Sequence, residues 1–193
     1  NNAFVCKEEM QEKYPDAEIC VFDSICASGG HGLLIYHAIE NKKKGMSVKE
    51  NMQALEELKH RIVHKFTVDD LTYLQRGGRI SKTAAVIGGM IQLKPVLHVD
   101  TEGRLAAESK VRGRKKALNQ LLAEMDICTG GYADKQDVVL ICHADCPEDA
   151  EYVRAKVEEK YHPNKIIMSE VGPIVGAHVG PGTMVLIFEG DKR

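Results

Sequence analysis

Residues 137–170 read DVVLICHADCPEDAEYVRAKVEEKYHPNKIIMSE, and this stretch indicates the fold class. DVVLICHA and KIIMSE are short apolar runs rich in strand-forming residues, which predict strands. Between them, PEDAEYVRAKVEEKY predicts a helix with Pro147 in its first turn, where Glu148 and Asp149 interact favourably with the helix dipole. Strand and helix signals alternate in this way along the chain, which is typical of an α/β protein.

The chain before residue 64 predicts part of an α/β layer with parallel strands. AEICVFD, residues 17–23, predicts a buried strand, and LLIYHAIENKKKG predicts a helix that ends at Gly45. Ser47 and Glu50 form a capping-box pattern at the start of the helical run SVKENMQALEELKHRI. The opening NNAFVCKEEMQ reads as the interior of a helix without a start signal. We therefore expect residues 1–64 to be the remainder of an N-terminal α/β domain that lacks its first strands.

The pattern changes after residue 64 and predicts a C-terminal α+β domain over residues 65–193. KFTVDDLTYL predicts a strand that runs into a short helix, and TAAVIGGMIQL predicts an apolar helix. PVLHV and RLAAESKV predict a hairpin around a turn at residues 100–103. A helix over RGRKKALNQLLAEMDIC and a last strand over TMVLIFEG complete this part.

Composition excludes several classes of protein. The chain is 44% apolar and 28% charged, as in an ordinary globular domain, and it has no run of eighteen apolar residues. Its net charge of -2 and its lack of Trp argue against nucleic-acid binding by charge or stacking. Six scattered cysteines favour a reducing compartment, and Cys142, His143 and Cys146 lack the second ligand pair of a zinc site. We expect a cytoplasmic protein with no metal and no integral membrane association.

One candidate binding segment is VGPIVGAHVGPG, residues 171–182. Four glycines and two prolines surround His178, and Ile174 and Val175 are apolar neighbours. An imidazole in such a place can donate a hydrogen bond to a carboxylate or phosphate. A core histidine paired with a backbone carbonyl is the alternative, and composition by itself favours it. The dense glycines favour a backbone that approaches a ligand.

Two further segments have free backbone amides near charged or polar groups. QRGGRISK, residues 75–82, suits an anion, or it is a solvated turn in which Ser81 caps the next helix. SGGHG, residues 28–32, is either a generic anion niche at a helix start or an ordinary Ser28 N-cap. No Ser-His-Asp, HExxH or paired-carboxylate pattern stands out, so the chain reads as a binding protein rather than an enzyme.

Positive charge concentrates between residues 72 and 116. This stretch holds ten Lys or Arg and three Asp or Glu, an excess of seven, so the rest of the chain carries about -9. Such an asymmetry indicates a charged partner or ligand. A nucleic-acid-binding or regulatory module that uses the basic 76–116 stretch is therefore an alternative function, and a solvated helix face is a third interpretation.

Several motifs in a fixed order resemble a known family. YLQRGGRISK, LKPVLHVDTEGRL, KVRGRKKAL and GAHVGPG, together with VFDS and SGGHG, resemble the DegV family of bacterial fatty-acid-binding proteins. The resemblance implies a two-domain α/β fold with one long-chain fatty acid between the domains. It also implies a role as the acyl-binding subunit of a fatty acid kinase. Such a subunit has no cofactor or catalytic residue of its own, and it presents the carboxylate to a separate ATP-binding subunit that forms an acyl phosphate.

The resemblance also assigns residues. His178, in the HxGPG motif, would contact the carboxylate. A Thr and a Ser of the N-terminal domain would be the other head-group ligands, with the Ser in an SSxLSGTY-like segment expected before Asn1. The acyl channel is expected from Gly88, Met90, Ile91, Ile174 and Val175, since each buried CH₂ contributes about 0.8 kcal/mol. We expect five cations to cluster as a docking surface for the kinase subunit: Arg76, Arg79, Lys110, Arg112 and Arg114.

Overall fold

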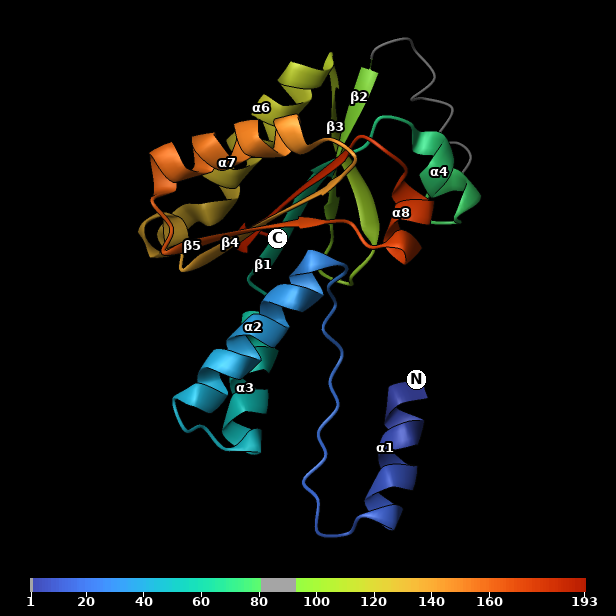
Figure 1. The fold of residues 1–193 in the computed structure, drawn as a ribbon, viewed down its shortest axis with the longest axis vertical. Coiled ribbons are helices and arrows are strands. Elements are labelled where there is room, and N and C mark those ends of the chain that lie inside the picture. The colour runs from blue at the N-terminus through green and yellow to red at the C-terminus, as the bar shows by residue number, and fades with distance from the viewer. Residues whose placement is uncertain (1, 81–92) are drawn as a thin grey trace.

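The chain is built around one six-stranded sheet with the strand order β3-β2-β1-β6-β4-β5 (Figure 1). The computed structural model describes residues 2–80 and 93–193. The strands are β1 (Ile62–Thr67), β2 (Leu93–Val99), β3 (Leu105–Arg112), β4 (Val138–Ala144), β5 (Lys165–Glu170) and β6 (Thr183–Glu189). The helices are α1 (Asn2–Lys13), α2 (Gly29–Lys43), α3 (Val48–Leu58), α4 (Leu71–Arg76), α6 (Arg114–Thr129), α7 (Pro147–Tyr161) and α8 (Pro173–Val179), with a 3₁₀ helix, η1, at Gly130–Lys135. The predicted α/β fold class is confirmed.

The stretch 137–170 forms the unit β4–α7–β5. Pro147 lies at the first helical positions of α7, Glu148 and Asp149 lie in its first turn, and His162 ends it in a left-handed conformation. β4 and β5 are parallel, from Val138 opposite Lys165 to His143 opposite Glu170. The other strand pairs of the described chain are antiparallel, so β6 inserts between β4 and β1 in the opposite direction.

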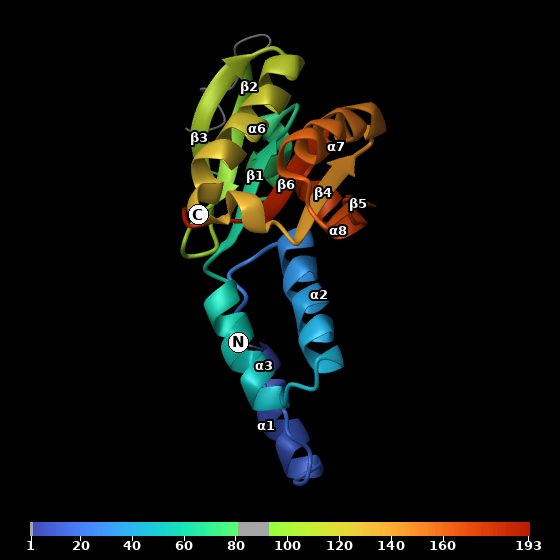
Figure 2. The same ribbon diagram turned by 90° about the vertical axis from the view of Figure 1, so that its left-hand side faces the viewer.

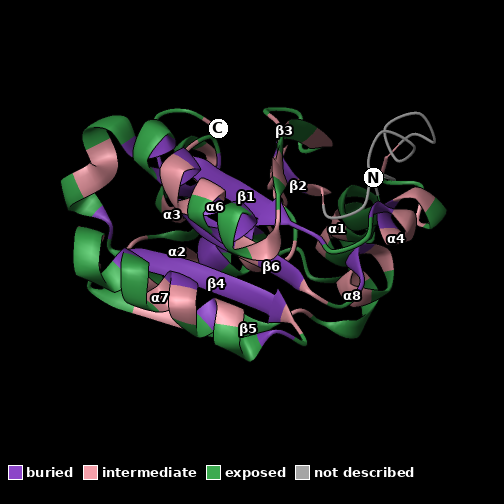
Figure 3. Cartoon of the chain, turned by 90° about the horizontal axis from the view of Figure 1, so that it is seen from above, coloured by how far each residue is buried: buried purple, intermediate pink, exposed green. Residues whose placement is uncertain are grey.

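Alternation along the strands separates two apolar faces. Successive strand residues point to opposite faces, so Val63 of β1, Val139 of β4 and Leu186 of β6 face one side. Helices α6 and α7 cover that side and contribute Leu121 and Val153 to its core (Figure 2). The inner strands are buried and the outer faces of the helices are exposed (Figure 3).

The opposite face of the sheet is covered by two separate groups of helices. α2 and α3 pack against one part of it through Leu33, Leu55 and Ile187. α4 and α8 pack against another part through Leu74, Val179 and other residues around Phe66. Figure 1 shows α2 and α3 extending below the sheet as a hairpin, whereas α4 and α8 lie beside it. The cavity described below lies between the start of α2 on one side and α4 and α8 on the other.

Two sequence expectations for the first 62 residues are wrong. The segment 17–23 is extended, but no described strand pairs with it, and its side chains are exposed or half-buried. A run of strand-forming residues makes a strand only where a neighbour takes up its backbone groups. The helix after Ser47 has the predicted capping box but ends at Leu58, because Ile62 belongs to β1. The expected parallel strands are therefore not found among the described residues before β1.

The predicted boundary at residue 64 falls within β1, which lies between β2 and β6 in the sheet. α1 stands apart from the sheet at the end of an extended segment, and none of its residues is buried (Figure 1). The division into domains at 1–64 and 65–193 stays a prediction.

Gly30 offers a test of how closely α2 approaches the sheet. A Cβ at Gly30 would lie 1.9 Å from His64 Nε2, whereas a Cβ at Gly32 would meet only Leu140 Cδ2 at 4.0 Å. We expect Gly30→Ala to lower the free energy of unfolding by about 1–3 kcal/mol, because a buried ring must move. Gly32→Ala, in the same helix, should be neutral or should stabilise by up to about 1 kcal/mol. Urea unfolding of both variants measures the difference, and equal midpoints would contradict the close contact.

Candidate functional site

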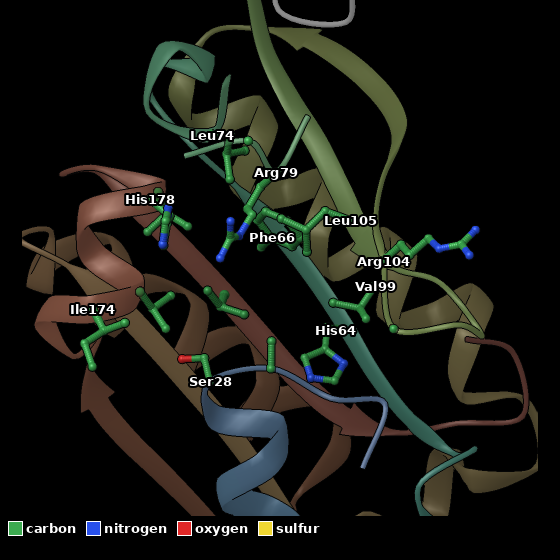
Figure 4. Close-up of a pocket in the computed structure, with 16 residues that line it drawn as sticks. Ser28, His64, Phe66, Leu74, Arg79, Val99, Arg104, Leu105, Ile174 and His178 are labelled. Carbon is green, nitrogen blue, oxygen red and sulfur yellow. The ribbon is translucent and has the colours of Figure 1, made fainter. Parts of the chain in front are cut away.

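A cavity of about 610 Å³ lies between the sheet, α4, α8 and the segment that precedes α2 (Figure 4). This volume is in the range of pockets that enclose small molecules. The sheet and the β2–β3 turn contribute His64, Phe66, Val99, Gly103, Arg104, Leu105 and Val185. The helices and their flanking residues contribute Ala27, Ser28, Leu74, Gly78, Arg79, Ile174, Val175, His178 and Val179.

The cavity wall is apolar with a few basic and neutral polar groups. Two arginines, two histidines and one serine line it, and none of the described lining residues is acidic. Aliphatic and aromatic side chains such as Phe66, Leu74 and Val185 make most of the remaining wall. Such a wall favours an anion with a long apolar part, because the arginines attract the charge and the apolar side chains take up the rest.

Glycines bring the QRGGR turn against the Gly-rich segment near the C-terminus. A Cβ at Gly77 would lie 2.1 Å from His178 Nδ1, so only glycine lets the end of α4 meet that ring. Gly180 has a φ of 75°, and a Cβ there would lie 2.5 Å from the Tyr73 ring. Arg79 Nη1 donates to the Gly77 carbonyl at 2.6 Å, and Figure 4 shows its guanidinium and His178 at the same end of the cavity. Two segments that the sequence marked separately as anion sites therefore share one site.

Three of the six predicted ligand-binding residues lie together on the cavity wall. His178, Ile174 and Val175 all line the cavity, with Ile174 at its rim because 80% of that residue is exposed. Gly88, Met90 and Ile91 lie outside the described residues, so their assignment to the acyl channel stays a prediction.

The five predicted docking cations have different environments. Arg79 lines the cavity, and Arg114 is engaged by two carboxylates: its Nε lies 2.7 Å from Asp149 Oδ2 and its Nη1 3.4 Å from Asp69 Oδ1. Arg76, Arg79, Lys110 and Arg112 are exposed, whereas Arg114 is half-buried. A shared docking surface stays a prediction, and its accessible members are these four.

His64 is a cavity residue that the sequence analysis did not single out. It is 2% exposed, and neither ring nitrogen makes a hydrogen bond of good geometry with the described chain, although the Ala27 and Ile62 carbonyls lie near the ring. Burial, assisted by the positive charge of Arg193, lowers the pKa of His64 to about 3, and nearby carbonyls of Ala27 and Ile62 oppose this only weakly. The sequence did contain a signal for this residue. Side chains alternate between the two faces of a strand, so IVHKFT places His64 on the same face as Phe66, among apolar residues.

Ser28 occupies the N-cap position of α2, as one sequence interpretation had it, but its side chain does not cap the helix. Its backbone has a φ of 48° and a ψ of -125°, which is rare for a residue other than glycine. Figure 4 shows the Ser28 side chain on the cavity wall, with its hydroxyl turned toward the side of Ile174. Arg193 holds the preceding loop by donating to the carbonyls of Ile25 and Lys59, and Lys59 Nζ donates to the Asp23 carbonyl at 2.9 Å.

The Cys142, His143 and Cys146 segment has a packing role. Cys142 and Cys146 belong to cores on opposite faces of the sheet, and His143 Nδ1 accepts a hydrogen bond from the Cys146 amide at 3.4 Å. Burial raises the pKa of the Cys142 thiol to about 11, which makes it a poor nucleophile or metal ligand at neutral pH. No group of three or more metal-ligating residues occurs within residues 2–80 and 93–193.

Comparison with known proteins gives the family. A family model described as "Uncharacterised protein, DegV family" matches residues 1–191. The chain belongs to the DegV family. It is 41% identical over its whole length to a DegV domain-containing protein of Clostridium perfringens, and it spans 66% of that protein, just under two thirds.

Solved structures of DegV proteins have the same fold. A structure described as DegV, a fatty acid binding protein from Bacillus subtilis, matches with a TM-score of 0.79 at 28% identity, over 97% of this chain and 66% of that one. The fatty acid kinase B3 protein of Streptococcus pneumoniae, solved with linoleic acid, matches with a TM-score of 0.89 at 22% identity, over 98% of this chain and 66% of that one. At 22% identity the second likeness shows the fold alone. No helix in the described part of this DegV chain is long and apolar enough to cross a membrane.

The low pKa of His64 predicts how the stability of this DegV chain depends on pH. The unfolded chain takes up a proton near the ordinary pKa of 6.5, whereas the folded chain does so only near 3. The contribution of His64 to the free energy of unfolding is therefore fully present above about pH 6.5. It is lost as the pH falls from 6.5 toward 3, by up to about 1.4 kcal/mol per pH unit.

Urea unfolding at about pH 7.5 and about pH 5 tests this, and we expect His64→Leu to reduce the loss. His37, whose pKa is also lowered by burial, titrates in both proteins and so cancels in the comparison. An unchanged loss in His64→Leu would show that His64 does not titrate in this way.

Proposed function

We propose that this DegV chain binds a long-chain fatty acid in the cavity, with the carboxylate near His178 and Arg79. The observation that carries this proposal is an apolar cavity with basic groups and, among its described lining residues, no acidic one. Each CH₂ removed from water contributes about 0.8 kcal/mol, so the tail supplies most of the affinity. The carboxylate must be paired where it leaves water, and His178 and Arg79 can both donate hydrogen bonds to it.

Relatives support the ligand class. The Bacillus subtilis protein, 28% identical, is described as a fatty acid binding protein. This chain spans just under two thirds of the relative that it matches. On the family resemblance, we assign the rest of the head-group site to an N-terminal domain. Residues 1–64 would then belong with that domain and residues 65–193 with the C-terminal one.

We further propose that the bound carboxylate is presented to a separate kinase subunit that converts it to an acyl phosphate. Phosphoryl transfer from ATP uses Mg²⁺ held mainly by carboxylates, and none of the described cavity residues is acidic. The partner would therefore supply ATP, metal and catalytic groups, and this chain would supply the oriented acceptor. This type of assembly is the one that the family resemblance implies, and a solved structure of the same fold is described as a fatty acid kinase B3 protein.

The alternative of a nucleic-acid-binding module has less support. Within the basic 76–116 stretch, Lys94 pairs with Asp69 at 2.8 Å, Arg104 pairs with Glu102 at 2.6 Å and Arg114 pairs with Asp149. Arg79 faces the cavity. Three cations of this stretch are thus paired with carboxylates and a fourth lines the cavity, and no specific observation favours nucleic acid.

Mass spectrometry of the extracted ligand tests the proposal directly. The full-length protein, purified without added lipid, should carry a long-chain acid that native mass spectrometry detects as a mass increment and extraction identifies. A protein without lipid, combined with nucleic-acid affinity that falls steeply with salt, would favour the alternative.

His178→Ala should impair presentation of the carboxylate more than binding of the tail. Loss of a hydrogen bond to a charged group costs about 1.5–3 kcal/mol, which is about tenfold to a hundredfold if fully expressed. The rate of kinase-coupled acyl-phosphate formation should fall about tenfold to a hundredfold, and the affinity for the fatty acid should change less. His60→Ala, at an exposed histidine, is the control. Unchanged turnover in His178→Ala would make His178 a core histidine only.

Charge reversal at the exposed cations should affect docking without affecting lipid. We expect the double variant Arg76→Glu, Lys110→Glu to associate more slowly with the kinase subunit and with a weaker dependence on salt. The amount of bound lipid should stay at the wild-type level. Stopped-flow association at several salt concentrations measures the first effect, and lipid extraction measures the second. Loss of lipid with unchanged docking would contradict the assignment of this surface.

A further inference from the structure

Two polar side chains on the cavity wall are not needed by the proposed head-group end. Ser28 lies just before α2 and His64 lies on β1, whereas His178 and Arg79 come from α8 and the turn after α4. Figure 4 shows His178 and Arg79 together at one end, with Ser28 and His64 along the opposite part of the cavity. A simple hydrocarbon tail that extends from the head-group end would run past both of them.

Ser28 lies at a position where its backbone is strained, and its hydroxyl does not cap α2. Its φ of 48° and ψ of -125° suit glycine, and glycines follow it directly at positions 29 and 30. A serine at an N-cap normally bonds its hydroxyl to the helix, but this one does not. A strained residue is kept where the surrounding structure holds it, often at a ligand site, and here the strained residue lines the cavity.

His64 supplies an independent indication of a ligand. It is 2% exposed and lines the cavity. Its two ring nitrogens make no hydrogen bond of good geometry with the residues that the structure describes, and the nearby groups are the carbonyls of Ala27 and Ile62. Gly30 allows the start of α2 to press against the ring, since any Cβ there would overlap Nε2. A neutral imidazole has one donor and one acceptor, so an oxygen-containing group could use either. Buried polar groups are nearly always paired, and this one is not paired by the described chain.

We propose that Ser28 and His64 form a second polar subsite, which binds an oxygen on the acyl chain remote from the carboxylate. The inference rests on the proposed fatty-acid function and narrows the ligand class to long-chain acids that carry a hydroxyl or keto oxygen. An unsubstituted chain leaves both side chains facing hydrocarbon, which is unfavourable. A hydroxyl on the chain can exchange a hydrogen bond with the Ser28 hydroxyl or with the His64 ring, as donor or as acceptor.

Competitive displacement of a fluorescent fatty acid from the full-length protein tests the subsite. The competitors are octadecanoic acid and a set of hydroxyoctadecanoic acids with the hydroxyl at different carbons. We expect at least one hydroxy acid to bind about fivefold to tenfold more tightly than octadecanoic acid, the effect of about one net hydrogen bond. His64→Leu and Ser28→Gly should each remove most of this preference, and His64→Leu should bind octadecanoic acid at least as tightly as the wild type does.

Two controls keep the test specific. Ser28→Gly removes the hydroxyl at a backbone conformation that glycine adopts freely, so the variant should fold even if His64→Leu does not. His178→Ala should weaken all the acids by a similar factor, because they share the carboxylate, and His60→Leu should change nothing.

Binding of octadecanoic acid with no preference for any hydroxy acid would overturn the subsite and leave the proposed function standing. A preference that survives in both Ser28→Gly and a folded His64→Leu would also overturn it. Failure of every acid to bind the wild type would reject the proposed function and the subsite together.

Discussion

The alternation of side chains along β1 is the constraint on which the rest of the molecule depends. β1 pairs with β6 along all six residues and with β2 on its other side, and every one of its residues is buried. Because successive residues face opposite ways, Val63 and Lys65 point into the layer under α6, and His64 and Phe66 point toward the cavity. A shift of one residue would exchange the two sets, so the core and the site are determined by the same register.

Lys65 and His64 are adjacent buried residues of β1, and their polar groups have different surroundings. Lys65 Nζ lies 2.6 Å from Glu108 Oε2 and 3.9 Å from Glu124 Oε2, so its charge is compensated within the protein. Removing one partner of such a buried pair typically costs about 3–5 kcal/mol. His64 has no such partner in the described chain and is kept neutral by burial. Lys65 is therefore explained by the fold, and His64 is the residue on which the proposed second subsite depends.

Glycine-dependent contacts complete the cavity on its other sides. Gly77 allows α4 to meet His178, and Gly30 allows α2 to meet His64. The main functional groups of the cavity are thus positioned by elements separated by more than a hundred residues of sequence, from Ser28 to His178. The charged residues are also divided between the cavity and its surroundings. The acidic residues that pair with Lys94 and Arg114 lie outside the cavity, whereas Arg79 lines it.

The sequence by itself determined the elements whose signals are local. The β4–α7–β5 unit, the β2–β3 hairpin and the Ser47 capping box follow from apolar periodicity, turn residues and cap chemistry, and the motif order identified the family. The tertiary structure decided what depends on neighbours. AEICVFD has strand-forming residues but no partner strand among the described ones. His64 appears in sequence as one polar residue in an apolar strand, and only the approach of Gly30 and the absence of a described partner mark it as part of a site. Ser28 reads as an ordinary cap, but the structure shows that its hydroxyl does not bond to the helix, because a capping serine needs an extended backbone and Ser28 has a φ of 48°.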